Sequence, residues 1–240
     1  MNYKIKGLVI KNSPFKEHSI ILTVLTAEHG RLNILARGAR KTKKSALYTE
    51  VFTYSEFQLF KNRGMPVVDS ADVLEPFYGL RNDFNKLSLG QYFLEVASFS
   101  PQGSCGSELL RLVLNSLSLL SESKFSDEII KIVFELKYAY NEGFLPDSVI
   151  CSSCGEKAER WLFSQGFLCE KCAAGRGAAL SRAVCMAIEH VLSEHGMRAY
   201  KFNMNKEAVD YLSHLTGAYL SHYLDTEFKT LEYYNKYKLD

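Results

Sequence analysis

Hydrophobic and polar residues alternate in short runs along the first 80 residues, which is the pattern of β-strands. In one run, Leu32, Ile34 and Ala36 fall on one face and polar residues mostly on the other. We predict five strands, at residues 3–11, 20–25, 31–37, 51–60 and 67–74. The run 51–60 carries aromatic residues on both faces, which indicates a curved strand in a small barrel. Five short strands fit either an OB-like or an SH3-like barrel, and strand counting does not separate the two.

Beyond residue 80 the hydrophobic period changes to that of helices. We predict helices at 82–99, 104–122, 127–141, 180–194 and 205–225. Ser126 is a plausible N-cap and Gly143 a plausible C-cap of the third helix. The tyrosine-rich end, 230–240, is predicted to be a loosely held tail. The fold class is therefore α+β, with a barrel domain over 1–80 and a helical domain over 81–240.

The clearest chemical signal is a pair of C-x-x-C motifs inside the helical region. Cys151 and Cys154 form the first pair, Cys169 and Cys172 form the second, and 14 residues lie between the pairs. Two tight turns that each present two thiolates supply the corners of a tetrahedron, as in structural Zn²⁺ sites. Two disulfides are the main alternative. Four ligands leave no position for water, so we expect one structural Zn²⁺ per chain in the segment 151–172, which also contains a short hairpin.

The net charge of +2 hides an uneven distribution. Residues 1–80 carry 12 Lys and Arg against 7 Asp and Glu, whereas the remainder carries 17 against 20. Within the first part, residues 31–49 contain no acidic residue. Such a stretch is either a solvated loop or an anion-binding surface. The candidate DNA-contacting residues are Arg31, Arg37, Arg40, Lys41, Lys43 and Lys44.

Three features together favour nucleic-acid binding: this basic stretch, the small barrel, and the aromatic residues beside them. Bases stack on exposed aromatic rings in single-strand binders. The alternative is that the aromatic residues fill the barrel core. We assign Phe57 to the core and leave Tyr48 and Tyr54 open between the two roles.

The sequence gives no positive support for catalysis or for a membrane span. No H-E-x-x-H or Gly-x-Ser-x-Gly motif occurs, and the four-cysteine set has no open metal position. The N-terminus lacks the apolar stretch of a signal peptide, and the most apolar run, 109–120, is too short to cross a bilayer. We therefore expect a cytoplasmic protein that is not an enzyme.

The order of several short motifs resembles the bacterial RecO family over essentially the whole chain. These motifs are Gly7-Leu8-Val9-Ile10, the run from Ser19 to Thr26, Gly30, Leu35-Ala36-Arg37-Gly38-Ala39-Arg40, Leu74-Glu75-Pro76-Phe77, and the four-cysteine segment followed by Leu180-Ser181. The resemblance implies an OB-fold at the N-terminus and a helical remainder. Because the zinc segment is not universal in that family, its presence indicates a subgroup.

The resemblance also implies a function in DNA repair and recombination. Members bind single- and double-stranded DNA, anneal complementary strands and work with RecR. They help to load RecA onto DNA covered by single-strand-binding protein, whose acidic C-terminal tail they contact, so we expect a location at the nucleoid. Lys131, Lys137 and Arg182 are candidate cations for that tail. Two other classes stay open: an RNA-binding zinc-ribbon protein, and an adaptor that binds acidic peptides.

Overall fold

The computed structural model describes residues 2–41, 43–60, 64–103 and 105–238, with the side chains of Lys43 and Lys44 outside the description. The chain forms two compact units. The first is Met1–Glu122 together with Lys229–Asp240, and the second is Ser123–Phe228. The boundary expected near residue 80 coincides with the change from strands to helices, whereas the units divide after Glu122.

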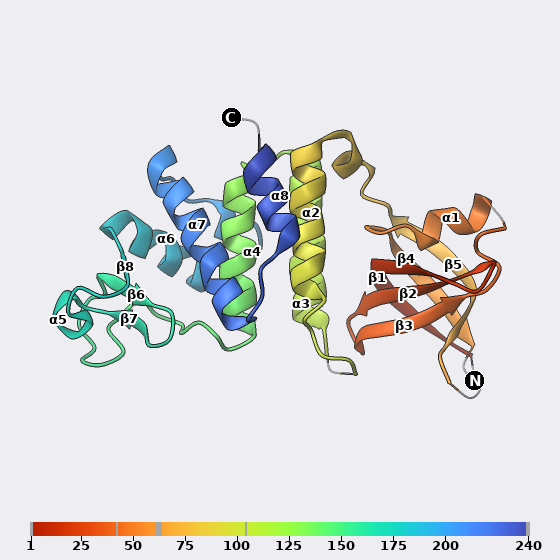
Figure 1. Ribbon diagram of the computed structural model, residues 1–240, viewed down its shortest axis with the longest axis horizontal. Coiled ribbons are helices and arrows are strands. Elements are labelled where there is room, and N and C mark those ends of the chain that lie inside the picture. The colour runs from red at the N-terminus through yellow and green to blue at the C-terminus, as the bar shows by residue number, and fades with distance from the viewer. Residues whose placement is uncertain (1, 42, 61–63, 104, 239–240) are drawn as a thin grey trace. The chain divides into compact units, whose positions relative to one another are not determined.

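The N-terminal part of the first unit is a five-stranded barrel (Figure 1). Its strands are β1 (Asn2–Phe15), β2 (Ser19–Thr26), β3 (Gly30–Ala36), β4 (Tyr54–Phe60) and β5 (Val67–Glu75). β1 pairs with both β2 and β4, and the order around the barrel is β1-β2-β3-β5-β4. Closure between β3 and β5 rests on a single parallel pair, Leu35 with Val67. This order and narrow closure are those of an OB-fold, a partly open five-stranded barrel, so the predicted fold class is confirmed.

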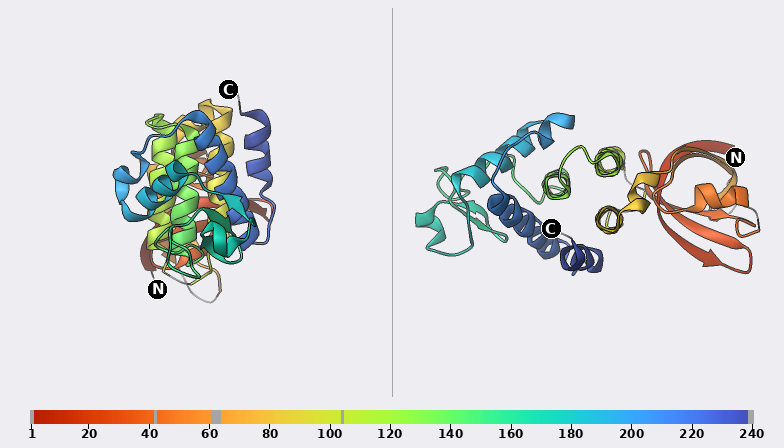
Figure 2. Two further views of the ribbon diagram at one scale, coloured as in Figure 1. Left: turned by 90° about the vertical axis from the view of Figure 1, so that its left-hand side faces the viewer. Right: turned by 90° about the horizontal axis from the view of Figure 1, so that it is seen from above.

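Alternation along the strands fills the barrel core. On β3 the buried residues are Ile34 and Ala36, and on β4 they include Phe57 and Leu59. Apolar residues from all five strands pack around these side chains. Figure 2 shows the strong curvature that this packing requires of the strands.

A short helix, α1 (Lys43–Thr49), follows β3, although the sequence pattern gave no sign of a helix before residue 80. Its Tyr48 packs against the barrel core and meets the Phe57 ring edge-on, with the ring centroids 6.3 Å apart. Tyr54 is half-buried as well. The open question about these two tyrosines is therefore settled for Tyr48, which covers the core.

Three helices and one 3₁₀ turn complete the first unit: η1 (Tyr78–Asn82), α2 (Phe84–Ala97), α3 (Ser107–Glu122) and α8 (Lys229–Tyr237). The prediction of a loose C-terminal tail is wrong, because α8 packs along α2 (Figure 1). It buries Leu231 and Tyr234, and the Glu95 carboxylate on α2 accepts hydrogen bonds from the backbone N–H and the hydroxyl of Thr230.

The second unit is built on α4 (Asp127–Asn141), α6 (Arg182–Ser193), η2 (Gly196–Tyr200) and α7 (Lys206–Tyr223). The Ser126 hydroxyl caps α4 as predicted, by accepting from the N–H of Ile129. α4 and α7 pack together around a buried ion pair of Lys131 and Glu135. Among the helices in the described part of the chain, none is both long and apolar enough to cross a bilayer.

Candidate metal centre and nucleic-acid interface

The four cysteines of the two C-x-x-C motifs lie on and beside short elements of the second unit. These elements are β6 (Arg160–Leu162), β7 (Gly166–Leu168), β8 (Ala178–Ala179) and the single-turn helix α5 (Glu170–Ala173). β6 and β7 form the hairpin predicted between the two motifs. Cys151 and Cys154 precede this hairpin, and Cys169 caps the N-terminus of α5. The fold thus brings together two turns that are distant in the sequence.

The geometry of the four sulfur atoms fits a tetrahedral metal site. All four Sγ atoms lie within 4.8 Å of one another. Cys154 Sγ lies 3.7 Å from both Cys169 Sγ and Cys172 Sγ. With a Zn–S bond of about 2.3 Å, the edge of a regular ZnS₄ tetrahedron is about 3.8 Å. Each of the six cysteines is a free thiol, and the cluster could bind a metal ion such as Zn²⁺.

The surroundings of the cluster also favour a cation. Backbone N–H groups, that of Cys169 above all, lower the pKa of the Cys151 thiol to about 6. The neighbouring sulfur atoms, that of Cys169 first, raise the pKa of the Cys172 thiol to about 12. Four clustered thiolates repel one another, and a bound divalent cation removes that repulsion. When bound, Zn²⁺ would supply the cross-link that these short elements lack.

The hairpin is attached to helix α7 through Trp161, the only tryptophan of the chain. The Trp161 side chain is fully buried and lies 4.5 Å, centroid to centroid, from the ring of Tyr219 on α7. Phe163 and Phe167 also contact the indole ring. The hairpin between the two C-x-x-C motifs is therefore packed on α7 through contacts between aromatic rings.

The candidate nucleic-acid interface lies where two loops meet at one end of the barrel. The backbone N–H of Arg40 donates to His18 O over 3.1 Å, and its guanidinium donates to Glu17 O over 3.3 Å. The turn between β1 and β2 therefore lies against the segment that follows β3. Four exposed cations belong to this end of the barrel, and we call them the basic cluster: Lys16, Arg37, Arg40 and Lys41. Lys43 and Lys44 begin α1 directly after it.

Arg31 does not belong to the basic cluster, although the sequence grouped it with the others. It is the second residue of β3, whereas Arg37 follows the last residue of that strand. Six residues of strand separate them by about 20 Å. Arg31 is half-buried beside the segment around Gln102, and its Nε atom is buried with no acceptor among the described residues. The six predicted cations therefore do not form one surface.

Conversely, Lys16 belongs to the cluster and was missed from the sequence. The signal could not be local, because residues 17–18 contact Arg40, which lies more than 20 positions further along the chain. Glu17 is also exposed there, so the surface is not purely basic.

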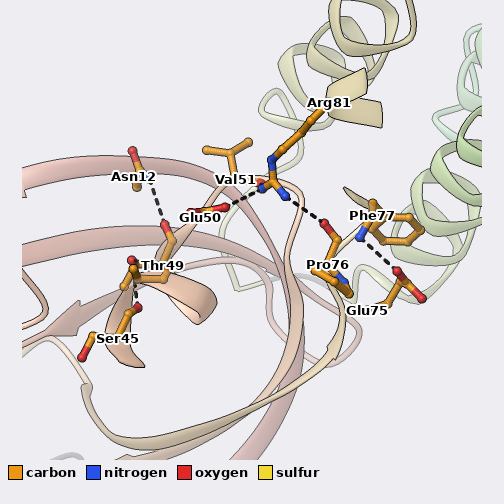
Figure 3. A network of polar contacts seen from close by, with 10 residues as sticks. Asn12, Ser45, Thr49, Glu50, Val51, Glu75, Pro76, Phe77 and Arg81 are labelled. Carbon is orange, nitrogen blue, oxygen red and sulfur yellow. Dashed lines mark hydrogen bonds and ion pairs between the residues drawn. The ribbon is translucent and has the colours of Figure 1, made fainter. Parts of the chain in front are cut away.

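The far end of α1 is fixed by polar contacts to β1 and η1 (Figure 3). Asn12 Nδ2 donates to Thr49 O over 2.8 Å. Arg81 Nη2 forms an ion pair with Glu50 at 2.8 Å and donates to Val51 O over 3.1 Å. The segment that carries Arg37, Arg40 and Lys41 is therefore held at both ends, by Arg40 at the start and by Asn12 and Arg81 after α1.

The three cations considered for an acidic peptide differ sharply in accessibility. Lys131 is buried in its ion pair and faces no solvent, so this candidate is wrong. Lys137 is half-buried, and its Nζ donates to Leu192 O and Glu194 O at 3.1 and 2.8 Å. Burial lowers the pKa of Lys137. Arg182 is exposed at the start of α6.

Fold and site define an OB-barrel protein with a helical region and a four-cysteine cluster that could bind a metal. The family models "Recombination protein O N terminal" and "Recombination protein O C terminal" match residues 1–77 and 81–232. The chain is 31% identical to "DNA repair protein RecO" of Acetivibrio thermocellus, over 97% of this chain and 96% of that protein. A protein with the same description from Alkaliphilus metalliredigens is 35% identical over 72% of this chain and 72% of its own. Another, from Caldicellulosiruptor bescii, is 29% identical over 96% of this chain and 97% of its own. The chain belongs to the RecO family of DNA repair proteins.

Proposed function

We propose that this protein is a recombination mediator that binds single- and double-stranded DNA and acts without catalysing a reaction. It anneals complementary strands and, with RecR, helps to load RecA onto DNA covered by single-strand-binding protein, whose acidic tail it contacts. It acts in the cytoplasm, at the nucleoid. Membership of the RecO family over both parts of the chain carries this proposal.

The basic cluster supports the DNA-binding part of the proposal. Exposed Arg and Lys side chains on two touching loops suit phosphate groups, and a mediator must hold DNA whatever its sequence. The proposed contacts are Arg37, Arg40, Lys41, Lys43 and Lys44, with Lys16 beside them. Each phosphate contact to a single strand contributes roughly −0.7 to the slope of log K against log salt concentration. Five contacts of the segment 37–44 therefore predict a slope of about −3.5.

The test is fluorescence anisotropy of a labelled single-stranded oligomer across a salt series. The variant Arg37→Ala/Arg40→Ala/Lys41→Ala should bind more weakly, with a slope of about −1.4 from the two remaining contacts. A matched control, Lys4→Ala/Lys6→Ala/Arg111→Ala, removes the same charge from elsewhere on the first unit.

Arg31→Gln provides a second comparison, because Arg31 lies about 20 Å along β3 from the basic cluster. We expect its slope to equal that of the wild type. Equal losses in the triple variant and the charge-matched control would contradict the assigned contacts. Tighter binding of RNA than of DNA of the same sequence would favour the RNA-binding alternative.

We also propose that Cys151, Cys154, Cys169 and Cys172 hold one structural Zn²⁺. Metal analysis should find one equivalent of zinc per chain, and chelation should lower the melting temperature of the unit Ser123–Phe228, followed through Trp161 fluorescence. Cys154→Ser should lose the metal, whereas Cys105→Ser, a change at an exposed cysteine outside the cluster, should retain it. A metal-free protein that melts at the same temperature would refute the structural role.

A further inference from the structure

Helix α8 carries an exposed aromatic surface. The face of α8 that packs on α2 uses Leu231 and Tyr234, and the Tyr234 side chain is only 2% exposed. Tyr233 and Tyr237 are 58% and 46% exposed. The three tyrosines of α8 thus divide into one that is buried and two that are about half exposed.

These two tyrosines form a contiguous surface with a residue from the start of α2. The rings of Tyr233 and Tyr237 are nearly parallel, with an interplanar angle of 17° and centroids 6.1 Å apart. Phe84, which is 56% exposed, meets the Tyr237 ring edge-on at 6.0 Å. We call Phe84, Tyr233 and Tyr237 the aromatic platform. Single exposed rings need no explanation, whereas a contiguous exposed group of three is a candidate binding surface.

The charge beside the platform indicates the chemistry of its ligand. Lys236 Nζ lies 5.2 Å from the centroid of the Tyr237 ring. A cation next to an exposed ring offers a phosphate contact beside a stacking surface, which is how single-strand binders combine the two interactions. Glu232 lies on the same helix, so the surface would not attract polyanions by charge alone. Affinity at this surface would come mainly from stacking.

We propose that the aromatic platform is a second contact surface for single-stranded DNA, on which unpaired bases stack. It belongs to the same compact unit as the basic cluster. The inference rests on the proposed DNA-binding function and extends it: the basic cluster holds phosphates of either single or double strands, whereas the platform takes only bases that are not already stacked in a duplex. It therefore gives the protein a preference for single strands.

The test compares two double variants on fluorescein-labelled oligothymidine and on a blunt duplex. Tyr233→Leu/Tyr237→Leu removes both rings from an exposed helix face and keeps residues that favour a helix. Tyr233→Phe/Tyr237→Phe keeps the rings and removes only the hydroxyls. Tyr140→Leu, at an exposed tyrosine of the other unit, is the matched control.

Loss of one stacked base lowers affinity by about fivefold or more. We expect the leucine pair to lose at least that factor on the single strand, with unchanged duplex affinity and an unchanged salt slope, because no phosphate contact is removed. The phenylalanine pair and Tyr140→Leu should match the wild type. Photocrosslinking with an iododeoxyuridine oligomer should label α8.

Three results would overturn the inference: unchanged single-strand affinity of the leucine pair, equal losses on single strand and duplex, or a phenylalanine pair as weak as the leucine pair. The last would indicate that the hydroxyls act, as in a protein–protein contact. If the wild type binds no DNA, the proposed function fails and the inference with it. If the wild type binds DNA through the basic cluster and the leucine pair binds equally well, only the inference fails.

Discussion

Replacing Lys131 by Met should strongly destabilise the unit Ser123–Phe228. Lys131 Nζ lies 2.8 Å from Glu135 Oε2 and donates to Ser213 O at 2.5 Å, which joins α4 to α7. Both side chains are essentially inaccessible to water. Met keeps most of the volume of the lysine stem, so the change removes the ammonium group while leaving the packing largely intact.

Two arguments give the size of the loss in the free energy of unfolding. Each hydrogen bond to a charged group contributes about 1.5–3 kcal/mol, and the ammonium group makes two. Removing one partner of a buried ion pair costs about 3–5 kcal/mol, because the other charge stays buried. We therefore expect a loss of about 3–5 kcal/mol in the free energy of unfolding. For a unit of about 100 residues this lowers Tm by roughly 12–20 °C, at about 4 °C per kcal/mol.

The double variant Lys131→Met/Glu135→Leu separates the buried charge from the lost contacts. With both charges removed, the penalty of the isolated carboxylate disappears, and we expect at least about 2 kcal/mol of recovery. The Thr216 hydroxyl donates to Glu135 in the wild type. In the double variant it keeps Leu212 O, at 3.0 Å, as a hydrogen-bond acceptor.

Trp161 makes the assay specific to one unit. It is the only tryptophan and packs on α7, so urea unfolding followed by its fluorescence reports on Ser123–Phe228. Arg111→Met, at the exposed Glu108–Arg111 pair of the other unit, should leave this transition in place and cost less than about 1 kcal/mol. A loss below about 1 kcal/mol in Lys131→Met, or a double variant as unstable as the single one, would refute the reasoning.

Two further predictions concern close packing and alkaline pH. Gly106→Ala should destabilise the first unit by about 1–3 kcal/mol, because the new Cβ would lie 2.6 Å from Thr26 O and 2.9 Å from Gly30 Cα. Thermal unfolding followed by circular dichroism measures this loss. Unchanged stability would contradict the close approach. Burial raises the pKa of both Tyr138 and Tyr219 above 10.0, so the folded state binds these protons more tightly than the unfolded state. Their stabilising effect is fully present below about pH 10 and is lost as the pH rises further, so tyrosinate absorbance should show two tyrosines that ionise only with unfolding. Ionisation of all tyrosines in the folded protein would contradict it.

The sequence predicted the elements whose signals are local. Alternation at Ile34 and Ala36 located β3, and Ser126 located the start of α4. The two C-x-x-C motifs identified the four-cysteine cluster, because each turn fixes two thiols by itself. In each case the residue pattern and the final structure depend on the same few neighbours.

The sequence failed where structure depends on distant partners. Helix α8 buries only Leu231 and Tyr234, too few apolar positions for a helical pattern, and it depends on α2, more than 130 residues earlier, for its packing. Arg31 and Arg37 are close in sequence, but a strand separates close residues by about 3.3 Å each. An acid-free run is therefore a poor guide to a charged surface when a strand lies inside it.

The assignment of each site to a compact unit determines how variants should combine. The basic cluster and the aromatic platform lie in the first unit, and the buried Lys131 pair and the four cysteines lie in the second. In the described contacts, the Lys131 pair shares no hydrogen-bond partner with the basic cluster. Effects of sites that share no partners add. Lys131→Met should therefore lower the stability of its own unit and leave the salt slope of DNA binding unchanged. A change in that slope would show that the second unit itself supplies phosphate contacts.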